Sequence, residues 1–208
     1  MNMLAIDCCL KLTGVALMTS DIFDSEQYDL GRQQSAELPL MTERIIRRHN
    51  LSFSDIDYVA LTSGPGYFTG IRVGAAYASG LAYASGAKII HVSSLEVLAH
   101  SFRNDSFRND RKVLVLVYAG HGFVYASCNG FLDAGEYSHE DILSWLNDNH
   151  DAKIISDDPE RISMNQIAMQ RVKPEMLSLC EFARERINLA VSPINLKISY
   201  YRAPQGVN

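Results

Sequence analysis

The 208-residue sequence has little of what defines several classes of protein. Its four cysteines form no CxxC pair, which excludes a disulfide-rich secreted scaffold. The fifteen residues between Arg72 and Lys88 carry no charged side chain but are too few to span a bilayer. The first residues lack the basic end and long apolar run of a signal peptide. We therefore expect a cytoplasmic protein without a membrane segment.

Positive charge is also in short supply. Nineteen Lys and Arg against 24 Asp and Glu give a net charge of −5. A free-standing nucleic-acid binder normally carries a basic surface, so any nucleic acid is expected to be held by a partner. Hydrophobic residues, in contrast, make up 47% of the chain, which is enough for a sizeable core and excludes disorder over its whole length.

Hydrophobic periodicity predicts alternating strands and helices, interrupted once. Residues 101–110 are the pentapeptide SFRND in tandem, which we interpret as a linker between two α/β subdomains of related layout. The predicted subdomains are residues 1–100 and a shorter one at 111–208. In the first, we expect strands at 2–7, 14–18, 23–30, 58–62 and 88–92 and helices at 35–49, 69–86 and 93–102. In the second, we expect strands at 112–118, 123–128, 131–137, 152–156 and 194–200 and helices at 138–149 and 175–189. Asn129-Gly130 predicts a two-residue hairpin turn, and Ser138–Asp141 predicts a capping box at a helix start.

The most informative segment is Ser63–Gly74, with the sequence SGPGYFTGIRVG. It reads as a strand end, a glycine loop and a helix N-terminus. Glycines let a backbone approach an anion closely, and the free N–H groups of a first helical turn point at it. A tight strand-to-helix turn without any ligand explains the same residues. From the residues alone both interpretations stay open.

The helix after this loop carries small residues at every fourth position, namely Gly70, Gly74, Ala78, Ala82 and Gly86. Such a stripe lets another backbone come very close. Each interior glycine costs about 1 kcal/mol of helix stability relative to alanine, so close packing is expected to compensate. The neighbour is either the protein's own sheet or a helix of another subunit, and the two alternatives are compatible.

Several segments together resemble the bacterial TsaB (YeaZ) family. They are Ala5–Asp7, the GVAL at 14–17 and above all GPGYFTGIRVG at 64–74, where the family has GPGSFTGxRxG and only Tyr67 departs from it. Pro193–Arg202 is loosely similar to the closing P-x-Y-L-R element of that family. The resemblance is strong over residues 1–100 and thin beyond the repeat.

The resemblance implies a shortened actin-like ATPase (ASKHA, ribonuclease H-like) fold. It also implies a non-catalytic partner of TsaD (YgjD), joined by TsaE, in the transfer of a threonylcarbamoyl group to the adenosine next to the tRNA anticodon. The chain alone is then expected to form a homodimer and to meet tRNA only through the complex. No tightly bound cofactor is expected, with ATP at the complex interface.

The resemblance places the partner surface on the first two helices. The predicted contact residues are Leu38, Met41, Ile45, Gly70, Arg72, Gly74, Tyr77, Ala78 and Ala82. Substitutions Gly74→Leu and Ala78→Arg are accordingly expected to abolish partner binding and to leave the isolated fold largely intact. If a phosphate binds, the residues expected near it are Asp7, Gly64, Gly66 and Thr69.

Departures from the relatives argue against catalysis. The catalytic relative holds a metal with His-x-Glu-x-His, but Ser94 and Leu98 stand at the two histidine positions here. None of the six histidines forms an i,i+4 pair, so no metal is expected. Other departures are Gln34-Ser35 for His-Ser or His-Thr, Tyr118-Ala119-Gly120 for Asp-Ala-Arg, and Cys8-Cys9 for small hydroxyl residues. Two alternatives stay open: a small ATPase or kinase in which Asp7 orients Mg²⁺ or water, and a self-associating module without a tRNA role.

Overall fold

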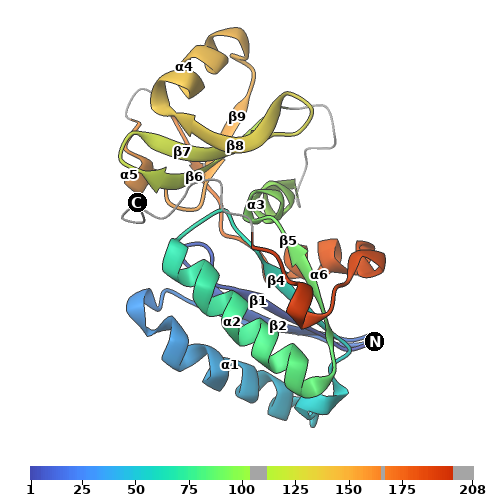
Figure 1. Ribbon diagram of the computed structural model, residues 1–208. Coiled ribbons are helices and arrows are strands. Elements are labelled where there is room, and N and C mark those ends of the chain that lie inside the picture. Colours follow the sequence, from blue (N-terminus) through green and yellow to red (C-terminus); the bar gives the residue numbers. More distant parts are fainter. Residues whose placement is uncertain (104–111, 165–166, 199–208) are drawn as a thin grey trace. The chain divides into compact units, whose positions relative to one another are not determined.

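The computed structural model describes residues 1–103, 112–164 and 167–198, and these form two compact units (Figure 1). The first unit contains residues 1–94 and the described residues from Glu175 onward, and the second begins at Leu95 and ends at Pro174. The predicted subdomains, 1–100 and 111–208, differ from these units at both boundaries, because the second unit already begins at Leu95 and the described residues from Glu175 onward belong to the first. Residues 101–103 of the predicted linker continue a helix, and the rest of it lies outside the described residues.

The first unit is built on a five-stranded sheet of order β3-β2-β1-β4-β5. Strand β1 runs antiparallel to β2, β2 antiparallel to β3, and β1, β4 and β5 are parallel to one another. Its strands are β1 (Met3–Asp7), β2 (Thr13–Met18), β3 (Phe23–Tyr28), β4 (Tyr58–Thr62) and β5 (Lys88–Val92). Its helices are α1 (Gln34–Arg48), α2 (Phe68–Ser85), α6 (Met176–Glu185) and the short η1 (Gly31–Gln33), η2 (Phe53–Asp55), η3 (Ile187–Leu189) and η4 (Pro193–Asn195).

Helices cover both faces of this sheet, and this explains why β1 and β2 are buried along their whole length. Alternate residues of a strand point to opposite faces. Leu4 and Ile6 belong to a core that also contains the apolar stripe of α1 and the small residues of α2. Helix α6 packs on the same strands from the other side (Figure 1). The apolar face of the sheet that α1 and α2 leave uncovered determines where α6 packs. Helix α6 therefore belongs to the first unit, although it follows the second unit in sequence.

The second unit repeats the layout of the first. Its sheet has the order β8-β7-β6-β9-β10, with β6, β7 and β8 antiparallel in turn and β6, β9 and β10 parallel. The strands are β6 (Val113–Gly120), β7 (Phe123–Cys128), β8 (Leu132–Ser138), β9 (Lys153–Ser156) and β10 (Gln170–Arg171). The helices are α3 (Ser94–Arg103), α4 (His139–Asp148) and α5 (Pro159–Ile162). The predicted α/β class with two related subdomains is confirmed.

Local sequence signals account for much of this unit. Gly130 has φ of 76°, as expected for the Asn-Gly turn predicted between β7 and β8. The predicted capping box is present, because Asp141 N–H donates to Ser138 Oγ at 3.0 Å and the Asp141 carboxylate accepts from Ser138 N–H at 2.9 Å. Helix α5 and strand β10, by contrast, are not among the predicted elements.

The strand predicted at 194–200 is wrong over its described residues, and 199–200 lie outside them. Pro193–Asn195 form a short 3-10 turn, closed by the Asn195 N–H on the Ser192 carbonyl at 2.9 Å. Proline has no N–H for a sheet ladder, so the chain turns here. Within the described part of this C-terminal segment, Val191 alone pairs with the sheet, through two hydrogen bonds of 2.8 Å with Ile89 at the edge strand β5. Among the described residues, no helix is long and apolar enough to cross a membrane.

Candidate functional site

The glycine loop lies between β4 and α2, at the carboxyl ends of the parallel strands of the first unit. It is tied down on two sides. Ser63 N–H donates to the Val92 carbonyl at 3.0 Å, and Ser94 N–H donates to the Gly64 carbonyl at 2.9 Å. On the other side, Tyr67 N–H at the start of α2 donates to the Cys9 carbonyl at 2.7 Å. The loop is therefore held between the end of β5 and the residues that follow β1.

Two glycines of this motif are required by the chain itself. A Cβ atom at Gly66 would overlap the Cys9 carbonyl oxygen, and one at Gly70 would overlap the Cys8 carbonyl oxygen. These carbonyl groups present the negative ends of their dipoles where a bound phosphate would have to approach. The geometry favours the tight turn over the anion cradle.

Asp7 is the acidic residue at the end of β1, and its carboxylate is buried with 1% exposure. Its Oδ1 atom accepts hydrogen bonds from the Thr62 hydroxyl at 2.6 Å and from the Cys9 N–H at 3.0 Å. The structure thus gathers Asp7, Gly64 and Gly66 in one closed cluster, whereas Thr69 is exposed on the first turn of α2. In this cluster Asp7 acts as a hydrogen-bonding centre that joins β1 to β4.

The two cysteines after β1 are held as neutral thiols. Burial, and next the negative charge of Asp7, raises the pKa of the Cys9 thiol to about 12, and the same two causes raise the pKa of Cys8 well above its ordinary value. The Cys9 thiol donates to the Thr62 carbonyl at 3.1 Å. Because a thiolate is the form that attacks electrophiles and binds metals, both residues serve packing here.

The departures from the relatives have clear places in the structure. Gln34 is 8% exposed, and its side-chain amide donates to Thr13 Oγ1 at 2.9 Å and to the Cys8 carbonyl at 3.4 Å. It therefore seals the same cluster from the side of α1. Tyr118, in the second unit, is stacked under the Arg161 guanidinium, which lies 4.5 Å from the ring centroid. Within the ranges that the structure describes, no three His, Cys, Asp or Glu side chains are grouped to hold a metal ion.

The predicted contact residues of α1 are not on a surface. Leu38, Met41 and Ile45 are each 0% exposed and form part of the core under α1. The prediction that these three side chains meet a partner is wrong. An amphipathic helix buries its apolar stripe against its own sheet first, and this one does so.

The predicted stripe on α2 also faces inward. Gly74, Ala78 and Ala82 are buried, and a Cβ at Gly74 would lie 3.3 Å from Cys8 Cβ and 3.5 Å from Leu61 Cδ1. This stripe with Gly70 packs on the protein's own β1 loop and β4, so these four residues are not at an exposed partner surface. The expectation that Gly74→Leu and Ala78→Arg leave the fold intact is therefore wrong.

A second small-residue stripe lies on the opposite face of α2, and the sequence prediction missed it. Ala76, Gly80 and Ala84 are exposed and again follow one another at every fourth position. The predicted contact residue Arg72 continues this stripe toward the N-terminus and is exposed, and Tyr77 is half-buried beside it. The sequence signal for this exposed stripe is Arg72, because a charged side chain indicates which side of a helix faces solvent.

An apolar groove runs along this exposed face. It has a volume of about 410 Å³ and is lined by Phe53, Ala76, Tyr77, Gly80, Leu81 and Ala84. Phe53, from η2, is 40% exposed, and Tyr83, on the neighbouring position of α2, is 83% exposed. Large aromatic side chains left this open beside a row of small residues are typical of a surface that another protein covers.

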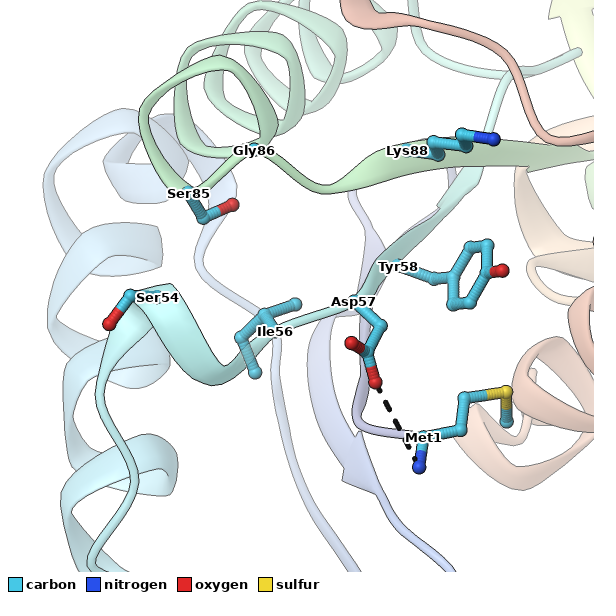
Figure 2. A pocket seen from close by; sticks show the side chains of 8 residues that line it. All are labelled: Met1, Ser54, Ile56, Asp57, Tyr58, Ser85, Gly86 and Lys88. Carbon is cyan, nitrogen blue, oxygen red and sulfur yellow. Dashed lines mark ion pairs between the residues drawn. The ribbon is translucent and has the colours of Figure 1, made fainter.

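A second cavity, of about 530 Å³, lies at the end of the sheet opposite to the glycine loop, and Ser54 and Ser85, which follow the groove residues Phe53 and Ala84, line it (Figure 2). It opens where β4 and β5 begin, with Tyr58 and Lys88 on its wall and the N-terminal amine 3.8 Å from Asp57 Oδ2. In open sheets with parallel strands, ligands bind outside the carboxyl ends of the strands. This cavity lies at the amino ends, so we assign it no function.

Comparison with known proteins identifies the class. The family model for TsaD, described as tRNA N6-adenosine threonylcarbamoyltransferase, matches residues 29–204, which is most of the chain. TsaB proteins, named for tRNA threonylcarbamoyladenosine biosynthesis, are also similar: that of Buchnera aphidicola (from Schizaphis graminum) is 28% identical over 73% of this chain and 67% of its own length. That of Escherichia coli is 32% identical over 60% of this chain and 53% of its own length. The chain thus spans between half and two thirds of these relatives.

Solved structures agree on the fold. YeaZ-like proteins of Pseudomonas aeruginosa superpose with TM-scores of 0.78 and 0.71, at 23% identity and over 97% and 96% of this chain. The first of these is described as an uncharacterized protein with similarity to the peptidase YeaZ. The chain belongs to the TsaB (YeaZ) family, and it has the actin-like fold that the sequence resemblance implies.

Proposed function

We propose that this chain is the non-catalytic partner of a TsaD-type threonylcarbamoyltransferase. In this role it supports the formation of threonylcarbamoyladenosine in tRNA by docking on that enzyme through the exposed face of α2, defined by Ala76, Gly80, Ala84 and the flanking Phe53, Tyr77 and Tyr83. TsaE joins the pair, and tRNA is held by the assembled complex. Without the enzyme, the same face pairs with a second copy of the chain.

Gly80 is the single observation that carries this proposal. A glycine within a helix costs about 1 kcal/mol relative to alanine. Gly70 and Gly74 repay that cost, because the β1 loop packs closely against them. At Gly80, no atom lies within 4 Å of the position that a Cβ would occupy, and its backbone is helical. Nothing within the described chain requires a glycine there, whereas a partner helix in close contact would.

The aromatic side chains of Phe53 and Tyr83 beside the groove supply the binding energy that small residues cannot. Tyr83 and Phe53 are the exposed large side chains beside the groove, and aromatic residues dominate the binding energy of many interfaces. Tyr77 is anchored by a hydrogen bond to Thr42 of α1, and burial raises the pKa of its hydroxyl. The groove is therefore formed before docking, which lowers the entropic cost of association.

The closed glycine loop supports a non-catalytic role. In that cluster the Asp7 carboxylate is engaged with Thr62 and Cys9 and is 1% exposed, so no water or metal ion reaches it from solvent. The neighbouring thiols are held neutral. The alternative of a small ATPase or kinase needs these groups open to a phosphate, and we do not favour it.

The test is the solution mass of the chain mixed with TsaD from the same organism, measured by light scattering with and without TsaE and ATP. We expect a species at the summed mass for the wild-type chain. Gly80→Leu fills the groove from an exposed position and is expected to weaken association about 100-fold. The matched control is Ser144→Leu, which adds the same side chain to an exposed position of α4.

The outcomes separate the parts of the proposal. Loss of the complex in Gly80→Leu, with thermal stability not lowered and Ser144→Leu normal, supports docking through α2. Normal binding by Gly80→Leu would move the interface elsewhere. If the wild-type chain and TsaD form no complex at any salt or nucleotide condition, the partner role itself is refuted, and ATP turnover by the chain alone becomes the relevant assay.

A further inference from the structure

Arg72 is the one charged residue in the eighteen residues of α2. Its guanidinium lies 3.7 Å from the centroid of the Phe68 ring, one turn earlier on the same helix. The side chain is exposed, and within the part of the chain that the structure describes no carboxylate pairs with it. It stands four residues before Ala76, so it forms the N-terminal end of the exposed stripe.

This cation gains no stabilisation from its place in the helix. Arg72 is the fifth residue of α2, near the end that carries the positive pole of the helix dipole, where negative side chains are stabilising and positive ones are not. The first turn of α2 contains no acidic residue to compensate. The result is a concentrated positive charge at one end of an otherwise uncharged face, in a chain whose net charge is −5.

We propose that Arg72 determines the specificity and orientation of docking, by pairing with a carboxylate on the partner. The partner surface is a helix with small side chains that ends opposite Arg72 in an Asp or Glu. This inference rests on the proposed function, and it adds the chemistry of the surface that is recognised. The stacked Phe68 ring holds the planar guanidinium in place, ready for a two-pronged contact with a carboxylate.

The same argument favours a different protein over a second copy of this chain. Because α2 contains no Asp or Glu, the α2 helix of a second copy has no carboxylate to offer Arg72. Two copies can pack their small-residue faces against each other, but neither α2 helix then provides a carboxylate for the Arg72 of the other copy. A partner that supplies the carboxylate therefore gains over self-association, which is how interfaces distinguish between similar partners.

The test is the affinity for TsaD as a function of salt, by isothermal titration calorimetry at about 0.05 M and about 0.5 M NaCl, where screening differs strongly. Arg72→Met keeps the length of the side chain and removes the charge. We expect its Kd to rise about tenfold at low salt and to converge on the wild-type value at high salt. Arg72→Lys, which keeps the charge but not the planar fork, is expected to fall between the two.

The matched control is Lys153→Met, which removes the same charge from an exposed position of β9 and is expected to bind like the wild type. Equal affinity and equal salt dependence of Arg72→Met and wild type would overturn the role of Arg72 while leaving docking through α2 in place. A change confined to self-association would assign the carboxylate to a second copy and also overturn the inference. Absence of wild-type binding would instead refute the proposed function on which it rests.

Discussion

The two faces of α2 have nearly the same composition and opposite surroundings. The inner face, Gly70, Gly74, Ala78 and Ala82, is buried against the chain's own β1 loop and strand β4. The outer face, Ala76, Gly80 and Ala84, opens onto solvent and an apolar groove. Small residues on the inner face are explained by the fold. Those on the outer face are not, and the difference isolates the part of this helix that is available for a partner.

The comparison also shows what the conspicuous motif does. GPGYFTG includes the residues that resemble the family most, yet its glycines serve a close approach between the loop and Cys8 and Cys9. The residues on which docking is proposed to depend lie one and more turns later and are ordinary alanines and a glycine. A motif can therefore identify a family by the turn it builds, while the functional surface is carried by its neighbours.

The largest effect expected from the comparison is that of arginine at the two faces. Ala78→Arg places an unpaired charge and a long side chain in a fully buried position, and we expect it to lower the free energy of unfolding by about 4 kcal/mol or more. Ala76→Arg, half a turn away on the exposed face, is expected to change it by no more than about 0.5 kcal/mol. Urea unfolding followed by circular dichroism measures both. Similar losses for the two variants would mean that the faces are not distinct.

Gly70→Ala tests the inner face with a single methyl group. The added Cβ would overlap the Cys8 carbonyl oxygen, and because that neighbour is backbone, the helix or the β1 loop must shift. We expect a loss of about 3 kcal/mol in the free energy of unfolding. The measurement is the same urea titration. A loss below about 1 kcal/mol would show that the β1 loop yields easily, and the argument against a phosphate at these glycines would weaken with it.

Much of this fold follows from local sequence signals. The Asn129-Gly130 turn, the capping box at Ser138 and the strand alternation place the elements of both sheets, and the glycine loop is predicted between the correct strand and helix. Local signals did not place α6. Nothing in residues 176–185 says which sheet they pack on, because that choice depends on which apolar face is left uncovered. The return of the chain to the first unit is a tertiary property.

The stripe predicted as a partner surface and the exposed stripe lie on the same helix, but on opposite sides of it. Two stripes with a spacing of four residues exist on α2, and glycine and alanine give no hydrophobic contrast between them. Arg72 supplies that contrast, because it lies on the same side of the helix as Ala76 and Gly80. For α1, the prediction is wrong for a physical reason: Leu38, Met41 and Ile45 form the apolar stripe that the helix buries against its own sheet, so they are not available to a partner.

Gly80→Ala is the outer counterpart of Gly70→Ala and is expected to have the opposite sign. The exposed helical position has room for a methyl group, so the substitution should raise the free energy of unfolding by about 0.5–1 kcal/mol. In the presence of TsaD, the gain is expected to be offset by a weaker contact at the groove. Destabilisation of the isolated chain would show that Gly80 is required by the fold and would remove the main support for docking there.

The smallest expected effect concerns the different contacts that hold α1 and α2 on the sheet. Helix α1 is clamped to β3 by charges: Arg48 contacts Asp24 and Glu26 at 2.6 Å each, Arg44 contacts Glu26 at 2.8 Å, and His49 contacts Asp24 at 2.9 Å. Burial alone would raise the pKa of both carboxyls, but these hydrogen bonds outweigh it and hold the pKa of each below its ordinary value. The inner face of α2 has no charged group.

Acid should therefore loosen α1 before α2. Because the folded-state pKa values of Asp24 and Glu26 are lowered, their stabilisation is present above the unfolded-state pKa near 4 and is lost as the pH falls through the folded values. Hydrogen exchange at about pH 3.5, corrected for intrinsic rates, should show protection in α1 falling roughly three- to tenfold relative to α2. At neutral pH, Arg48→Met should by itself cause part of the same loss of protection in α1, because it removes the cation that contacts Asp24 and Glu26. An equal fall in both helices would mean that they open together, and that the charged clamp and the packed face stabilise one cooperative unit.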